Sequence, residues 1–103
     1  MPSTLDRLAG WYRAQCDGVW EHSYGLKIDT LDNPGWTLSI DLAGTALADV
    51  TFSEIKVGDS DLESSRWMTC RKKGVVFEAF CGPELLEEVV NVFLDWAELR
   101  TAG

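Results

Sequence analysis

Several features that would place this chain in a familiar functional class are missing from its sequence. No stretch approaches the roughly 18 consecutive apolar residues of a membrane-spanning helix. The opening residues, MPSTLDR, are not a positively charged segment followed by an apolar run, so they predict no secretory signal. The glycine-rich phosphate loops GxGxxG and GxxxxGK followed by Ser or Thr are absent as well.

Cysteine is scarce, and its pattern points away from a secreted protein. The three cysteines, Cys16, Cys70 and Cys81, are odd in number and widely spaced, which does not describe a disulfide framework. Reduced thiols are typical of the cytoplasm. We therefore predict a cytoplasmic protein.

Positive charge is in short supply too. Nine Lys and Arg residues stand against 17 Asp and Glu residues, which gives a formal net charge of −8. Such a surface repels nucleic-acid phosphates and anionic lipid head groups, whereas it attracts a basic protein and speeds the encounter. We expect a protein partner, with a basic surface favoured, and no nucleic acid or membrane.

The sequence does contain ample material for one hydrophobic core. Of 103 residues, 46% are hydrophobic and five are Trp, which predicts a single domain over residues 1–103. A helix is expected over residues 4–17, with Ser3 and Asp6 forming a capping box and Gly18 ending it in the left-handed conformation. A second helix is expected to open at residues 82–83, where Pro suits the first position, and to run through Leu99.

Alternating polar and apolar residues predict strands between these helices. Residues 24–31 and 36–42 alternate and are joined by the turn sequence DNPG, so they form an antiparallel hairpin. Over residues 50–57 the alternation breaks near Ser53 and Glu54, which indicates either a bulge or a strand that begins only afterwards.

A second hairpin is predicted from residues 66–71 and 75–80, closed by the basic turn KKG at residues 72–74. The predicted fold is therefore α+β, with a mostly antiparallel sheet of about five strands flanked by an N-terminal and a C-terminal helix packed on one face.

Residues 16–22 gather a thiol, two carboxylates and the only histidine of the chain, His22. A zinc site needs about four ligands at recognisable spacing, and no second Cys/His cluster exists. A Cys–His pair needs both groups within hydrogen-bond reach, which this spacing does not establish. We predict neither metal nor catalysis here. Instead, Cys16 is expected in the core, and Trp20, just past the helix end, is expected to be partly exposed.

Cys81 precedes the expected second helix, and a helix N-terminus can lower the pKa of a thiol. Three carboxylates, Glu84, Glu87 and Glu88, crowd the same helix end and oppose thiolate formation. We therefore expect Cys81 to end a buried strand, and we predict no catalytic residue and no cofactor. The alternative is a small thiol enzyme, similar to a sulfurtransferase, that uses Cys81 or Cys16.

Two long segments resemble the immunity protein 53 family of bacterial polymorphic toxin systems. One is WY at residues 11–12 together with residues 15–36, which include CDGVWEH and YGLKIDTLDNPGW. The other is CGP at residues 81–83 with LEE at 86–88 and FLDW at 93–96. The resemblance spans nearly the whole chain, although residues 45–71 offer little motif to match.

The resemblance implies a cytoplasmic immunity protein that binds and blocks a cognate toxin domain. We expect the contact surface to include residues from the segment at 18–22, the turn at 32–36 and the acidic loop at 59–63. The candidate residues are Trp20, Glu21, His22, Asp32, Trp36, Asp59, Asp61 and Glu63. A homodimer formed through exposed Trp residues is a further alternative.

Overall fold

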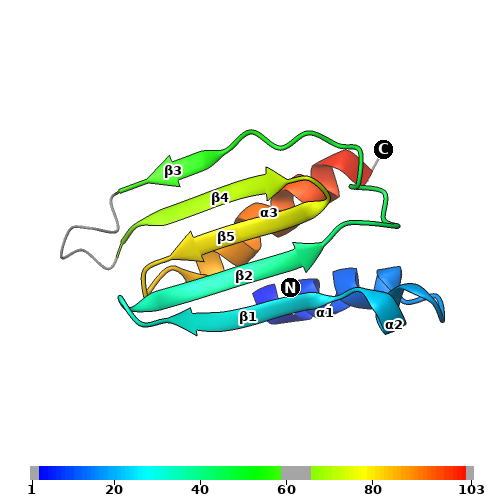
Figure 1. Ribbon diagram of the computed structural model, residues 1–103, viewed down its shortest axis with the longest axis horizontal. Helices are drawn as coiled ribbons and strands as arrows, with labels where there is room; N and C mark the ends of the chain where they lie inside the picture. The colour runs from blue at the N-terminus through cyan, green and yellow to red at the C-terminus, as the bar shows by residue number, and fades with distance from the viewer. Residues whose placement is uncertain (1–2, 59–65, 102–103) are drawn as a thin grey trace.

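In the computed structural model, residues 3–58 and 66–101 are described, and they form three helices and a five-stranded sheet (Figure 1). The elements in chain order are α1 (Thr4–Gln15), α2 (Trp20–Ser23), β1 (Leu26–Leu31), β2 (Gly35–Asp41), β3 (Ile55–Val57), β4 (Met68–Lys73), β5 (Val76–Cys81) and α3 (Leu86–Thr101).

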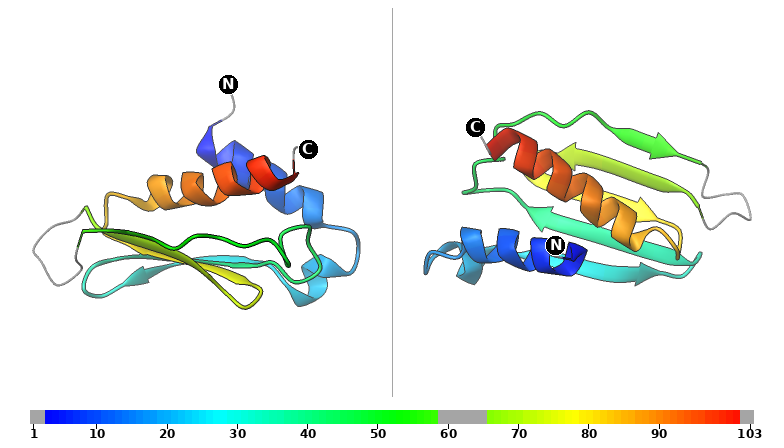
Figure 2. Two further views of the ribbon diagram at one scale, coloured as in Figure 1. Left: turned by 90° about the horizontal axis from the view of Figure 1, so that it is seen from above. Right: turned by 180° about the vertical axis from the view of Figure 1, so that it is seen from behind.

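The strands lie in the order β1-β2-β5-β4-β3, and every neighbouring pair is antiparallel. Both long helices cover one face of the sheet and leave the other face open (Figure 2). This arrangement confirms the predicted α+β class. No helix in the described part of the chain is both long and apolar enough to cross a lipid bilayer.

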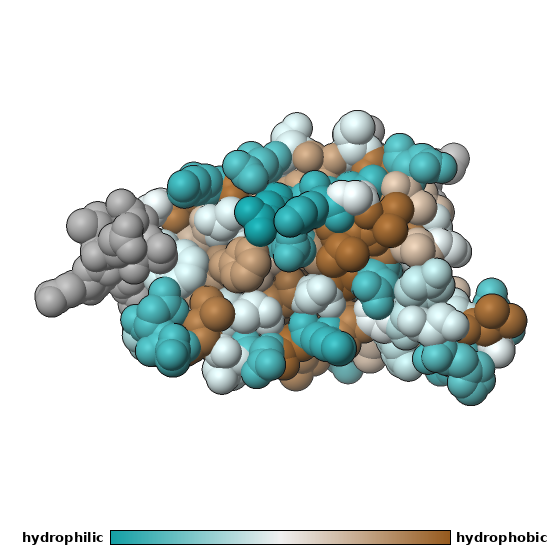
Figure 3. Space-filling view, viewed as in Figure 1, coloured by the Kyte–Doolittle hydropathy of each residue, from teal (hydrophilic) through white to brown (hydrophobic). Residues whose placement is uncertain are grey.

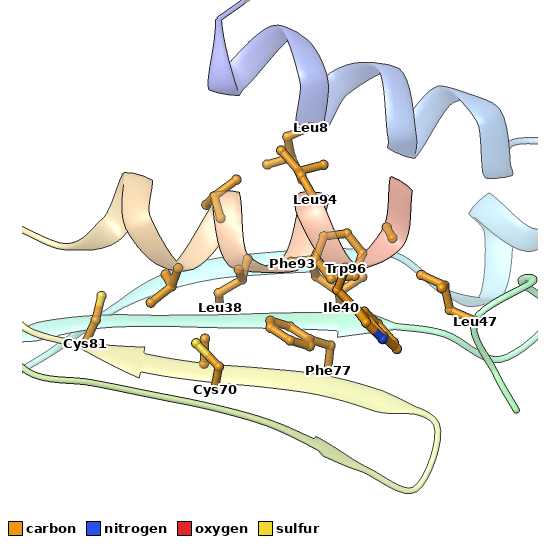
Figure 4. Packing of buried hydrophobic residues seen from close by; sticks show 14 of the residues in the cluster. Leu8, Leu38, Ile40, Leu47, Cys70, Phe77, Cys81, Phe93, Leu94 and Trp96 are labelled. Atoms are coloured by element: carbon orange, nitrogen blue, oxygen red, sulfur yellow. The ribbon is translucent and has the colours of Figure 1, made fainter. Parts of the chain in front are cut away.

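The core fills the space between the sheet and the helices (Figure 4). Strand alternation places Leu38 and Ile40 of β2 beside Phe77 and Ala79 of β5, because register pairs Leu38 with Ala79 and Ile40 with Phe77. These four residues are at most 1% exposed. The helices close the core with the buried side chains Leu8, Val89, Val90, Phe93, Leu94, Trp96 and Ala97.

The start of α1 is as predicted, but its end is not. Ser3 Oγ accepts the backbone N–H of Asp6 over 3.1 Å, and Asp6 Oδ2 accepts the N–H of Ser3 over 3.2 Å, which completes the capping box. The helix stops at Gln15, so Gly18 takes its left-handed conformation (φ 90°) in the following loop. Cys16 is exposed, with Sγ donating to the Tyr12 carbonyl over 3.4 Å, so the prediction that it lies in the core is wrong.

The helix α3 begins at Leu86, later than the predicted start at Gly82 and Pro83. Gly82 still follows the sheet, because its N–H donates to the Trp67 carbonyl over 2.9 Å. The Pro83 carbonyl accepts the indole N–H of Trp36 over 3.0 Å. The residues between β5 and α3 therefore form a turn bonded to the sheet, and the helix starts after it.

The break in alternation before β3 reflects a strand that begins late. The strand β3 covers only Ile55–Val57, and the segment before it is bound by side chains. Lys72 Nζ donates to the Val50 carbonyl over 2.7 Å, and Trp96 Nε1 donates to the Thr51 carbonyl over 3.1 Å. These bonds satisfy backbone carbonyls that a longer strand would have paired.

Candidate functional site

Residues 16–22 form a network of backbone hydrogen bonds around two carboxylates. Asp17 Oδ1 accepts the N–H groups of Val19 and Trp20, each over 2.9 Å. The Glu21 carboxylate reaches back to accept the N–H groups of Asp17 (2.9 Å) and Gly18 (2.8 Å). Backbone donors, Trp20 first and then Val19, hold the pKa of Asp17 below its ordinary value. The pKa of Glu21 is lowered by its own N–H and by those of Asp17 and Gly18.

This network starts α2, a short helix that the sequence prediction missed, and turns Trp20 inward. Trp20 is only 4% exposed, so the expected partial exposure is wrong. Its Nε1 donates to the Ala43 carbonyl over 2.9 Å, and its ring meets Trp11 edge-on at 6.1 Å. The available signal was the spacing of Asp17 and Glu21 around the aromatic residue, which is typical of a capped turn.

His22 is exposed and lines a mainly polar groove of about 450 Å³ beside the start of β1. The groove is lined by His22, Ser23, Tyr24, Gly25, Leu26, Lys27, Ser39 and Asp41. The Asp41 carboxylate has a structural role in this groove, because its Oδ2 accepts the Gly25 N–H over 3.0 Å. In residues 3–58 and 66–101, no three side chains of the types His, Cys, Asp and Glu lie close enough to hold a metal ion.

Two of the three thiols are sealed in the core. Cys81 ends β5 with no exposed surface, as predicted, and Cys70 is equally buried on β4. Burial raises the pKa of Cys70 to about 12 and that of Cys81 to about 11. These shifts are opposite to those of an activated nucleophile. Cys16 is the exposed thiol of the three.

The predicted contact residues do not converge on one place. Asp32 and Trp36 flank the β1–β2 turn, whereas Trp20, Glu21 and His22 lie at the other end of β1 (Figure 1). Asp32 is exposed, and Trp36 is partly buried. Asp59, Asp61 and Glu63 lie outside the described residues. The described candidates therefore lie in two places, one at each end of β1, which we call the two end surfaces. The longest dimension of the molecule is 43 Å.

An acidic stripe on α3 and the turn before it was not among the predicted contact residues. The stripe consists of Glu84 in the turn and Glu87, Glu88, Asp95 and Glu98 on α3. All five are exposed, and the four on α3 are spaced so that they share one helix face. Arg7 of α1 pairs with the last two, at 3.0 Å from Asp95 and 2.9 Å from Glu98. Arg66 approaches Glu84 at 3.7 Å. The helical spacing of these carboxylates was visible in the sequence.

The open face of the sheet has a different character. Figure 3 shows hydrophilic and hydrophobic side chains interspersed across it. Arg71 pairs with Glu78 over 3.3 Å, and its guanidinium lies 5.4 Å from the centre of the Phe80 ring. The negative charge of the protein is therefore displayed by α3 more than by the open sheet face.

Comparison with known proteins identifies the family. The model of the family described as Immunity protein 53 matches residues 5–98. The chain belongs to the immunity protein 53 family. No curated protein and no solved structure was found to match it. The match runs from the first turn of α1 to the last turns of α3, so both helices and the whole sheet belong to the immunity protein 53 domain.

An apolar groove borders the acidic stripe in this immunity protein 53 family member. It measures about 550 Å³ and lies between the C-terminal half of α3 and the segment leading into β3. Asp95 stands in its lining, and Leu99 is 80% exposed. The remaining lining residues are Phe52, Ile55, Val92 and Trp96. The groove and the stripe together present apolar and negative groups side by side.

Proposed function

We propose that this protein binds a cognate bacterial toxin domain and neutralises it by direct contact in the cytoplasm of the cell that makes it. Membership of the immunity protein 53 family carries the proposal. The net charge of −8 supports an encounter with a basic protein. The exposed, free thiol of Cys16 is of the kind that a reducing compartment maintains.

The surface that we favour for the toxin is the acidic stripe of α3 together with the apolar groove beside it. The groove supplies apolar area of the kind that forms the centre of a protein interface, and the carboxylates supply a charged rim. A toxin segment with Lys or Arg residues around an apolar side chain complements both. Glu87 and Glu88 are the residues that we expect to contribute most to steering, because Arg7 already pairs with Asp95 and Glu98.

The two end surfaces remain alternative contact sites. A typical interface covers about 800 Å² on each partner, a patch roughly 30 Å across. The long dimension of 43 Å exceeds that patch, so one toxin domain is not expected to cover both ends. A contact at the α2 end would use His22, and a contact at the turn end would use Asp32.

A thiol enzyme is the competing function, and the geometry gives it little support. Cys70 and Cys81 are buried with raised pKa values, so neither presents a thiolate to a substrate. Cys16 is exposed, but its Sγ is bonded to the Tyr12 carbonyl.

Calorimetric titration of the toxin domain encoded beside this gene, at low and moderate salt, tests the proposed binding. We expect saturable binding at a fixed stoichiometry. The affinity should fall as the salt concentration rises, because salt screens the attraction between exposed charges. A folded protein that fails to bind this domain at either salt concentration would contradict the proposal.

A further inference from the structure

The strand β1 forms an open edge of the sheet. It pairs with β2 along its whole length, from Leu26 opposite Ile40 to Leu31 opposite Gly35, and has no strand on its other side among the described residues. Its six residues contain no proline, and their register with β2 is continuous, so it lacks two of the devices that protect an edge, a proline and a bulge. The charged residues that it does carry, Lys27 and Asp29, are of opposite sign. The opposite edge, β3, is only three residues long.

The backbone groups that face outward from β1 can be assigned. The Asp41 N–H donates to the Gly25 carbonyl over 2.9 Å, so these two residues form a hydrogen-bonded pair. Hydrogen-bonded and non-hydrogen-bonded pairs alternate along an antiparallel ladder, so from Gly25 onward the backbone N–H and C=O groups of every second residue point toward β2. The N–H and C=O groups of Leu26, Ile28 and Thr30 therefore point away from the sheet. The Thr30 N–H donates to the side chain of its neighbour Asp29 over 2.8 Å, as expected for a group without a strand partner on that side.

We propose that a second copy of this chain pairs antiparallel with β1, about a two-fold axis at Ile28. In this register Ile28 lies opposite Ile28 of the second copy, and Leu26 lies opposite its Thr30. The outward-pointing backbone groups of these residues then form hydrogen-bonded pairs between the two chains. Lys27 then lies opposite Asp29 of the second copy, and Asp29 lies opposite its Lys27. Cross-strand pairs of opposite charge stabilise a sheet.

The charges select this register over its neighbours. If the second copy is shifted by one residue, backbone groups that point outward on one strand lie opposite residues whose groups point inward on the other. Only shifts of two residues keep the hydrogen bonds between the two strands. A shift of two in one direction places Lys27 opposite Lys27, and in the other direction it places Asp29 opposite Asp29. Like charges directly opposite each other destabilise a strand pair.

Exposed apolar side chains line the same edge. α1 lies over the sheet along β1 (Figure 2). Its residues Leu5, Ala9 and Tyr12 border an apolar groove of about 370 Å³ with Leu26. Leu5 is 72% exposed, Tyr12 40% and Ile28 38%. A two-fold axis perpendicular to the sheet places both copies of α1 on the same side, where these side chains can bury one another. The inference does not depend on toxin binding.

Sedimentation velocity of the full chain over a wide concentration range tests the pairing. We expect a reversible monomer–dimer equilibrium in the wild type. Lys27→Glu and Asp29→Lys each create two like-charge contacts, so each should raise the dimer dissociation constant about tenfold or more. Circular dichroism checks that both variants fold.

The complementary mixture makes the test specific. An equimolar mixture of the Lys27→Glu and Asp29→Lys chains restores opposite charges at both positions, and we expect it to dimerise at concentrations at which each chain alone is mostly monomeric. The double variant Lys27→Glu/Asp29→Lys should also regain the dimer. A wild-type chain that stays monomeric, or a mixture no more dimeric than its components, would overturn the proposal. So would a monomeric wild type in which Lys27→Glu weakens toxin binding, since β1 would then serve the toxin.

Discussion

The carboxylate of Asp17 accepts the backbone N–H of Trp20 at the start of α2, over 2.9 Å. This bond orients a buried indole that in turn donates to the carbonyl of Ala43, beyond β2. The sequence CDGVWEH is the most distinctive part of the family resemblance, and its Asp, Trp and Glu side chains are all engaged within the chain. We interpret the main role of this segment as structural: it holds α1 and α2 against the sheet.

Replacing Asp17 tests this interpretation. Asp17→Ala removes the acceptor for two N–H groups, and we expect the Tm at pH 7 to fall by roughly 5 °C. Asp17→Asn keeps an acceptor oxygen and should retain much of the stability. Thermal unfolding followed by circular dichroism compares the two variants, and equal Tm values for Asp17→Ala and the wild type would argue against a structural role.

The same residues predict acid sensitivity. The pKa values of Asp17 and Glu21 are lower in the fold than their ordinary values of 3.8 and 4.5, so the anions stabilise the folded state. Their contribution is complete above those values and is lost as the pH falls toward the folded pKa values. The difference in free energy of unfolding between wild type and Asp17→Ala should therefore shrink below about pH 4. Urea titrations at several pH values measure it.

Two glycines should respond oppositely to alanine. A Cβ at Gly35, in the first position of β2, overlaps the backbone carbonyl oxygen of Cys81 and lies 3.3 Å from the Trp67 ring. We expect Gly35→Ala to destabilise the protein by about 3 kcal/mol or more. Gly10 has no atom within 4 Å of the added Cβ, so Gly10→Ala should stabilise α1 by up to about 1 kcal/mol. Chemical denaturation measures both, and a tolerated Gly35→Ala would contradict the close strand contact.

Thiol labelling separates binding from the thiol-enzyme alternative. In the native protein at neutral pH we expect alkylation of Cys16 alone, because Cys70 and Cys81 are buried with pKa values of about 12 and 11. All three thiols should react after denaturation. Mass spectrometry counts the labels, and rapid native labelling of Cys81 would revive the enzyme hypothesis.

Removing charge from α3 should slow toxin binding. Glu87→Gln/Glu88→Gln raises the net charge by two units at the acidic stripe, and we expect the association rate at low salt to fall about tenfold. Thr37→Lys/Thr69→Lys makes the same change in net charge on the open sheet face, where both threonines flank Phe80, and serves as the control. Surface plasmon resonance compares the pairs. If both double variants slow association equally, the total charge of the protein and not the acidic stripe determines the association rate.

The sequence was most informative where local chemistry decides the structure. The capping box of Ser3 and Asp6, the hairpin around residues 32–34 and the buried position of Cys81 depend on neighbouring residues or on simple alternation, and all are present. The fold class followed from the same patterns. Element ends were less accurate, because they depend on bonds to distant residues.

Long-range contacts explain the errors. Trp36 bonds to the Pro83 carbonyl across the sheet end, and this contact belongs to a turn that delays α3 to Leu86. The spacing of Asp17 and Glu21 indicates the turn at the start of α2, but the burial of Trp20 also depends on its contacts with Ala43 and Trp11, which the local sequence does not reveal. The acidic stripe of α3 follows from helical spacing alone, but the sequence does not show that Arg7 pairs with two of its five carboxylates, Asp95 and Glu98.

Inhibition of the toxin is the central claim, and the most direct measurement is growth of cells that express the adjacent toxin domain with and without this protein. We predict that co-expression restores growth, that Glu87→Gln/Glu88→Gln protects less well at matched protein levels, and that the Thr37→Lys/Thr69→Lys control protects fully. Continued toxicity in the presence of abundant, folded wild-type protein would contradict the account.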